Sequence, residues 1–169
     1  MAQQVLKDLG KTAKLSFGIV GDPEQIPTNQ RDAGFKAVLK ADPNGKYVTV
    51  VNSKVDPQVS LRVTTDMLQG NRNINLVFAD TGPGAVGAIQ AIKQLGLSGK
   101  VSLYAFCAAS TKLDSTLYRA CAAQEPADYA RIVVGQVKKY LAGGSVKKTL
   151  LSPLKVFVAP QTPGPGEVG

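Results

Sequence analysis

The sequence predicts an α/β protein built on a doubly wound parallel sheet. Short, nearly continuous apolar runs alternate along the chain with stretches that repeat apolar residues every three or four positions. Apolar runs without polar alternation are typical of strands buried on both faces of a sheet, and the helices between them supply the cover. Right-handed crossovers between consecutive parallel strands then place helices on both sides.

Five segments have the composition of buried strands, and four stretches between or after them have the period of amphipathic helices. The predicted strands are residues 15–20, 47–51, 74–79, 101–106 and about 118–123. The predicted helices are residues 30–40, 57–69, 84–95 and 126–142, the last ended by Gly143 and Gly144.

The beginning of the chain reads as the last turns of an amphipathic helix. Val5, Leu6 and Leu9 share one face, and Gly10 is a suitable stop. The basic start and apolar stretch of a secretion signal are missing. Because the chain opens in the last turns of a helix, we expect it to be a piece cut from a longer protein, so the missing signal says little about where the parent protein is located.

The end of the chain departs from the regular alternation. Residues 154–158 suit a further short strand, whereas residues 159–169 contain three prolines and three glycines and cannot form a ladder or a helix. The predicted organisation is a single α/β lobe over residues 1–158 and a Pro/Gly-rich tail over residues 159–169.

Composition excludes several kinds of chemistry. The chain has no histidine, which removes Ser-His-acid and Cys-His catalytic groups, and its two cysteines are too few for a zinc tetrad. The formal net charge is +8, but the basic residues are scattered and tryptophan is absent, so we expect a solvated basic surface and no nucleic-acid partner. We predict no metal, no cofactor and no enzymatic activity.

One glycine motif invites a nucleotide-binding interpretation. Gly82, Gly84 and Gly87 match the spacing of the dinucleotide fingerprint after a predicted strand. The fingerprint also needs an acidic residue at the end of the next strand, but no carboxylate follows residues 101–106 until Asp114, and the motif normally follows the first strand of its domain. We expect these glycines to pack a helix closely on a strand.

Six segments, in order and at suitable spacing, carry a resemblance to a known family. They are residues 17–21, 29–35, 76–81, 85–96, 101–106 and 122–126. The chain resembles the second lobe of the periplasmic sugar-binding proteins of ABC transporters, the ribose-binding-protein-like group, over roughly residues 15–158. The resemblance implies a periplasmic or extracellular protein that closes two lobes on a sugar-like molecule and delivers it to an ABC permease.

The resemblance also bears on the helix at residues 126–142. In an intact family member this helix would help to build the other lobe. In an isolated lobe it could instead fold back and complete a five-stranded, flavodoxin-like unit with strand order 2-1-3-4-5. An isolated lobe is expected to bind weakly and could form a homodimer through its exposed apolar face.

The family's ligand contacts carry over to six positions of this sequence: Asn29, Asp80, Thr81, Phe106, Cys107 and Gln124. Three of them replace charged or strongly polar groups of the family: Asn29 an arginine, Thr81 part of an asparagine-aspartate pair, and Cys107 an aspartate. We therefore expect either a different, less polar ligand or no binding. Asp80, Thr81 and Asn29 also suit helix N-caps, and Arg31 is expected to form a structural ion pair.

The two cysteines admit two interpretations. Cys107 follows the fourth predicted strand and Cys121 lies on the fifth, and neighbouring strands bring Cα atoms within reach of a disulfide. The alternative is a pair of small buried thiols. A bridge would suit an exported protein.

A second function is compatible with the same architecture. The effector-sensing core of a LacI-like transcription regulator resembles this lobe as well. The cysteine pair favours the exported binding protein over the regulator.

Overall fold

The computed structural model describes residues 1–109, 111–150, 153–164 and 167–168. Its centre is a six-stranded sheet with strand order β2-β1-β3-β4-β5-β6. The strands are β1 (Leu15–Gly21), β2 (Gly45–Asn52), β3 (Leu76–Ala79), β4 (Ser102–Phe106), β5 (Tyr118–Ala123) and β6 (Lys155–Val158). The first five are parallel, which confirms the predicted α/β class and the order 2-1-3-4-5, and β6 adds an antiparallel edge beside β5.

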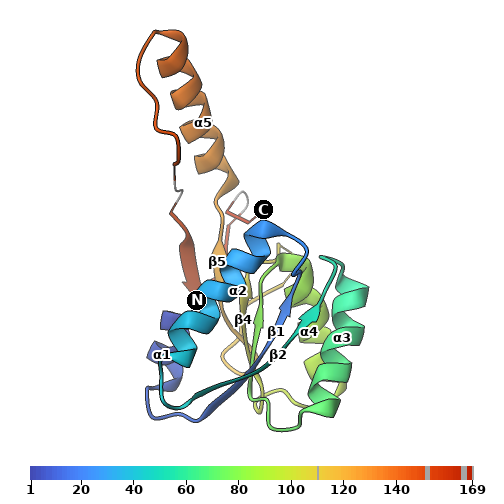
Figure 1. Ribbon diagram of the computed structural model, residues 1–169. Coiled ribbons are helices and arrows are strands. Elements are labelled where there is room, and N and C mark those ends of the chain that lie inside the picture. The colour runs from blue at the N-terminus through green and yellow to red at the C-terminus, as the bar shows by residue number, and fades with distance from the viewer. Residues whose placement is uncertain (110, 151–152, 165–166, 169) are drawn as a thin grey trace.

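Helices cover both faces of the sheet (Figure 1). Helices α1 (Ala2–Leu9) and α2 (Ile26–Lys40) pack on one face, and α3 (Pro57–Gly70) and α4 (Gly82–Gln94) pack on the other. The part of the chain that the structure describes contains no helix long and apolar enough to cross a membrane.

The strands contribute side chains to two separate cores. Within β3, Leu76 and Phe78 enter the cluster under α1 and α2, whereas Val77 and Ala79 enter the cluster under α3 and α4. Successive residues of a strand point to opposite faces. Both sets are apolar because both faces are covered, which is why the sequence shows continuous apolar runs.

Helix α1 closes the face that α2 leaves open. Ala2 and Val5 are buried, and the Tyr104 hydroxyl on β4 donates a hydrogen bond of 3.1 Å to Asp8 of α1. Gly10, with a φ of 82°, ends the helix in a conformation that favours glycine. The predicted N-terminal helix and its stop are confirmed.

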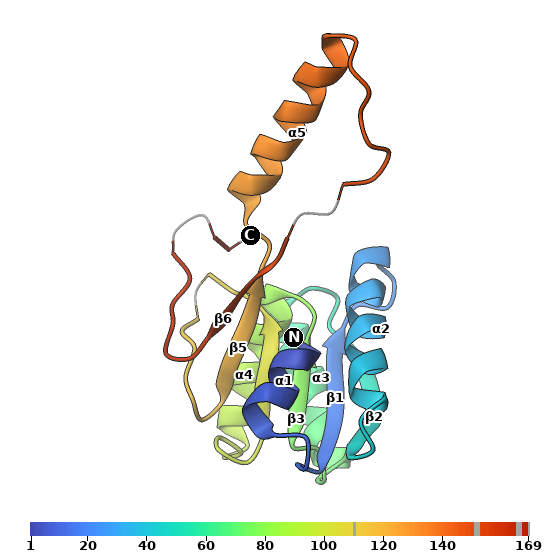
Figure 2. The same ribbon diagram turned by 90° about the vertical axis from the view of Figure 1, so that its left-hand side faces the viewer.

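Helix α5 (Pro126–Leu141) projects away from the sheet (Figures 1 and 2). None of its residues is buried. The prediction that it folds back onto the isolated lobe is therefore wrong. The physical reason is that α1 already covers the sheet beside α2, so the lobe has no open apolar face to receive α5.

The C-terminal segment returns to the lobe through β6. The Ala159 amide donates to the Arg119 carbonyl of β5 at 2.9 Å, and Lys155 of β6 pairs with Glu167 of the tail. Val168 reaches the cleft described below. The division of the chain into a lobe over 1–158 and a tail over 159–169 remains a prediction.

Candidate functional site

The carboxyl ends of the parallel strands meet at one edge of the sheet, where α2 and α4 begin. A cleft of about 320 Å³ opens at this edge. Its polar side chains come from α2, from the end of β3 and from the end of β5: Gln25, Thr28, Arg31, Thr81 and Gln124. Phe106, Cys107 and Ala122 supply apolar surface. This edge is the usual ligand position in open parallel sheets.

Four of the six candidate ligand contacts line this cleft: Thr81, Phe106, Cys107 and Gln124. The other two do not line it. Asn29 is exposed, and its side-chain amide donates to the Pro23 carbonyl at 2.6 Å, so it holds the turn before α2. The N-cap of α2 is Gln25 rather than Asn29.

Thr81 has the predicted helix-capping role, and its predicted ligand contact stays a prediction. It is the N-cap of α4, and its hydroxyl accepts a hydrogen bond of 3.2 Å from the Gly84 amide. It also lines the cleft. Close packing is found at Gly87, but against a helix rather than the expected strand: an added Cβ would lie 2.4 Å from the Pro57 carbonyl oxygen of α3.

Asp80 lies behind the cleft and is fully buried. One of its carboxylate oxygens accepts a hydrogen bond of 3.2 Å from the Asp22 amide, and the other has no partner. Asp32 of α2, also buried, likewise has one oxygen without a partner. A Cβ added to Gly21 would lie 2.6 Å from an Asp32 oxygen and 2.9 Å from an Asp80 oxygen, so the two carboxylates converge on this glycine.

Burial shifts the protonation of this pair. Desolvation, together with the nearby Asp80 carboxylate, raises the pKa of Asp32 to about 7. Desolvation also raises the pKa of Asp80 to about 6, against the lowering effect of the hydrogen bond from Asp22. Sequence reasoning missed this pair, because the two residues lie 48 positions apart. Among the residues described, no group of three or more His, Cys, Asp or Glu side chains is placed to hold a metal ion.

Arg31 has a different role from the one predicted. No carboxylate in the described ranges lies within ion-pair distance of it, so the prediction of a structural ion pair is wrong. Its Nη1 donates to the Asp80 carbonyl at 2.7 Å, and its guanidinium carbon lies 3.8 Å from the centroid of the Phe106 ring. Burial lowers the pKa of Arg31 and the neighbouring Asp80 raises it, but an arginine stays protonated. A fixed cation on an aromatic ring therefore lines the cleft.

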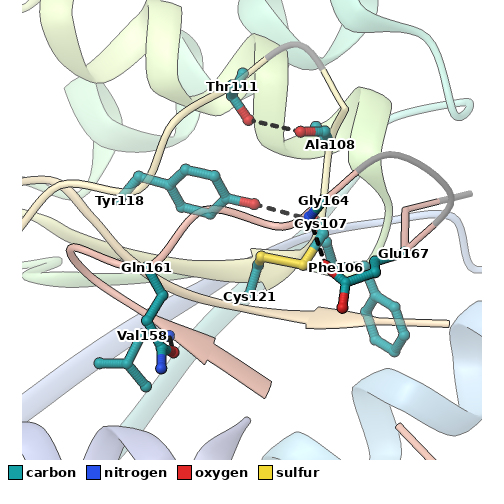
Figure 3. Close-up of a disulfide and its surroundings, with 10 residues drawn as sticks. All are labelled: Phe106, Cys107, Ala108, Thr111, Tyr118, Cys121, Val158, Gln161, Gly164 and Glu167. Atoms are coloured by element: carbon teal, nitrogen blue, oxygen red, sulfur yellow. Dashed lines mark hydrogen bonds between the residues drawn. A yellow bond between two sulfur atoms is a disulfide. The ribbon is translucent and has the colours of Figure 1, made fainter. Parts of the chain in front are cut away.

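Cys107 and Cys121 form a disulfide, so the structure has the bridge rather than two free thiols (Figure 3). Their Cα atoms are 4.9 Å apart, with Cys107 directly after β4 and Cys121 within the neighbouring β5. The Tyr118 hydroxyl donates to the Phe106 carbonyl at 3.3 Å from the same region. Together these contacts fix the position of Phe106 and Cys107 at the floor of the cleft.

Comparison with known proteins agrees with this fold. The family model described as periplasmic binding protein domain matches residues 1–145. The ribose import binding protein RbsB of Bacillus subtilis (strain 168) is 31% identical over 160 residues, which is 92% of this chain and 51% of that protein. The chain thus spans about half the length of this curated relative.

Solved structures with the same fold are also binding proteins. A periplasmic solute-binding protein from Actinobacillus succinogenes 130z with bound D-allose has a TM-score of 0.79 and 23% identity, covering 92% of this chain and 56% of that one. A solute-binding protein from Agrobacterium vitis bound with α-D-tagatopyranose has a TM-score of 0.83 and 21% identity, covering 93% and 53%. The chain belongs to the periplasmic binding protein domain family.

Proposed function

We propose that the chain is the C-terminal lobe of a two-lobe, sugar-binding solute-binding protein of an ABC transporter. It would hold a small sugar-like molecule in the cleft at the carboxyl ends of its strands. The observation that carries this proposal is that Thr81, Phe106 and Gln124, from three different strand ends, line one cleft. A few convergent polar groups beside an aromatic ring are typical of a small-molecule site.

Closure of two lobes on the ligand is consistent with the two segments that connect this lobe to α5. α5 follows β5 and projects beyond the cleft, and β6 brings the chain back beside β5 (Figure 2). The relatives are about twice as long as the matched region, so a second lobe would pack on α5. Two connecting segments at one edge of the sheet suit a hinge, because a few residues at element ends can absorb the rotation.

The proposed partners and location follow from the same assignment. The complete protein would work outside the cytoplasm, in the periplasm or extracellular space, and would deliver its ligand to an ABC permease. The Cys107–Cys121 disulfide supports an oxidising compartment. The lobe would bind without catalysing a reaction.

The LacI-like regulator core remains the alternative, because it shares the architecture. Extending the reading frame beyond Met1 separates the two. A first lobe preceded by an export signal would support transport, and a helix-turn-helix would contradict it.

Equilibrium binding tests the proposal directly. We expect the chain to bind D-ribose, D-allose or D-tagatose with roughly millimolar Kd, since one lobe supplies only part of the contacts. Gln124→Ala should weaken binding, whereas Gln69→Ala, at the opposite end of the sheet, should not. Absence of saturable binding for every sugar, or equal effects of the two variants, would contradict the proposed site.

A further inference from the structure

Part of the tail packs on the loop that follows β4. Thr162, Pro163 and Val168 share a cleft of about 150 Å³ with residues of that loop. Gly164 and Glu167 of the tail are among the residues that surround the disulfide in Figure 3. We call these five residues the strap.

Val168 reaches from the strap into the candidate ligand cleft. It lines the space of about 320 Å³ together with Thr81, Cys107 and Gln124, and it packs against the core cluster under α3 and α4. A valine side chain has no hydrogen-bonding group, so a sugar hydroxyl that faces it loses its water without gaining a partner. A polyhydroxylated ligand should therefore bind better when Val168 has left the cleft.

Lys155 of β6 fastens the strap. Its ammonium pairs with Glu167, whose carboxylate also accepts a hydrogen bond from the Gly164 amide. The same ammonium lies 3.9 Å from a carboxylate oxygen of Glu125 and 4.7 Å from the centroid of the Phe157 ring. One cation thus holds the strap, the start of α5 and β6 together.

This fastening joins the two segments that we assign to the hinge. Glu125 lies between β5 and α5, and its φ of 52° is a left-handed conformation that non-glycine residues seldom adopt. Lys155 is the first residue of β6. Rotation of a second lobe about these segments would change the distance between the two charged groups. The strap is therefore connected to lobe closure as well as to the cleft.

The contacts of the strap are weak enough to be exchanged for a ligand. The side chains of Lys155, Glu125 and Glu167 are 50%, 22% and 28% exposed. Ion pairs that are open to solvent contribute little to stability and are screened by salt. A segment held in this way can leave the cleft when a ligand enters.

We propose that the strap is an autoinhibitory contact: Val168 competes with the ligand for the cleft, and the pairing of Lys155 with Glu167 holds it there. The inference rests on the proposed function and adds its regulation. The ligand binds to molecules whose strap has left the cleft, so the apparent Kd equals the intrinsic Kd divided by the fraction of such molecules. A change that loosens the strap therefore raises the affinity.

Titration with D-ribose, D-allose and D-tagatose, followed by amide chemical shifts, tests this competition. Lys155→Ala should lower the apparent Kd about two- to fivefold, the range that loss of an exposed ion pair provides. Lys148→Ala is the matched control, because Lys148 is exposed and forms no ion pair with the residues that the structure describes. It should leave the Kd unchanged.

Two further variants act on the strap itself. Val168→Gly should lower the apparent Kd because it removes the side chain that enters the cleft, whereas Val146→Gly, at an exposed position after α5, should not. A chain that ends at Gln161 lacks the strap but keeps β6, and it should bind at least as tightly as Lys155→Ala.

Salt provides a test that needs no variant. The probe sugars are uncharged, so sodium chloride acts on the ion pairs of the protein and not on the ligand. Raising its concentration from about 0.01 M to about 1 M should lower the apparent Kd of the unmodified chain. The Kd of Lys155→Ala, which has already lost the fastening, should stay the same.

The ligand-free chain separates this inference from the proposed function. Lys155→Ala should shift the amide signals of Thr81 and Gly82, which share the cleft with Val168, and Lys148→Ala should not. Absence of that shift, or an equal or higher Kd after the strap is loosened, would overturn the inference and leave the proposed function in place. Absence of saturable binding in every protein would contradict the proposed function and with it the competition.

Discussion

At the residue scale, two carboxylates are buried beside the end of β1: Asp80, which follows β3, and Asp32 of α2. Asp32 and Asp80 approach each other over Gly21, whose missing side chain leaves the room that they occupy. Like charges at close range in a buried site cannot both ionise without cost. The pair should therefore make the stability of the lobe depend on pH.

The direction of that dependence follows from the raised pKa values. Asp32 has a pKa of about 7 in the folded chain, well above the ordinary value near 3.9 of an unfolded aspartate, so the folded state holds more protons between about pH 4 and pH 7. The free energy of unfolding should fall as pH rises through that window, and the stabilisation is fully present only below it.

Denaturant unfolding at about pH 5 and about pH 8 measures this effect. Asp32→Asn should reduce the difference between the two pH values by on the order of 2 kcal/mol. Asp66→Asn, at an exposed position of α3, should leave the difference as it is. A difference of equal size in all three proteins would show that Asp32 is not the responsible group.

At the element scale, sequence patterns predict the bounds of helices and strands, which depend on neighbouring residues. They do not predict where a helix packs when that depends on residues far away in the sequence. The strands and the helices at 57–69 and 84–95 are found within a few residues of their predicted bounds. The apolar runs of β1, β3, β4 and β5 are buried where they stand, and β2 at the sheet edge is partly buried. The suggestion that α5 could fold back failed because it depends on α1, over a hundred residues earlier, which packs on the sheet beside α2. Periodicity identifies a helix face but not its partner.

Also at the element scale, the disulfide links the loop after β4 to β5. Cys107 and Cys121 are separated by 14 positions, and closing a loop of that length restricts the unfolded chain by about 3 kcal/mol. The double substitution Cys107→Ser, Cys121→Ser should lower the free energy of unfolding by roughly that amount.

A reductant provides the control for this prediction. It should destabilise the unmodified chain and have no effect on the doubly substituted chain, as urea unfolding would show. Equal stability of the unmodified chain with and without reductant would contradict a structural role for the bridge.

At the scale of the whole molecule, the lobe carries an apolar helix that it does not cover itself. The exposed apolar side chains of α5 are Tyr129, Val133, Val134, Val137, Tyr140 and Leu141. A surface of this kind marks an interface. In the complete protein we assign it to the second lobe, and in the isolated chain we expect it to pair with a second copy.

Sedimentation velocity tests this expectation. The chain should self-associate as its concentration rises, and Val133→Lys with Val137→Lys should shift it toward monomer because both side chains are exposed on α5. Lys substitutions at Thr65 and Arg62 of α3 serve as a control on another helix. A chain that stays monomeric at every concentration would contradict the proposed homodimer.

At the same scale, part of the candidate site could be predicted from the sequence and part could not. Thr81, Phe106, Cys107 and Gln124 follow strand ends, and parallel strand ends meet, so their convergence could be predicted. The role of Arg31 in the cleft could not be predicted, because its contacts with Asp80 and Phe106 join residues from three separate segments. The sequence pattern does not distinguish the positions of Asp80 and Thr81. In the structure Asp80 is buried behind the cleft, whereas Thr81 lines it.

The central claim is that a ligand binds at the carboxyl ends of the strands, and a map of amide chemical shifts during a titration with D-ribose and D-allose tests it most directly. We predict saturable shifts at Thr81, Gly82 and Gln124, which line the cleft, and none around Asn73 at the other end of the sheet. Shifts confined to the Asn73 end, or no saturable shift with either probe, would contradict it.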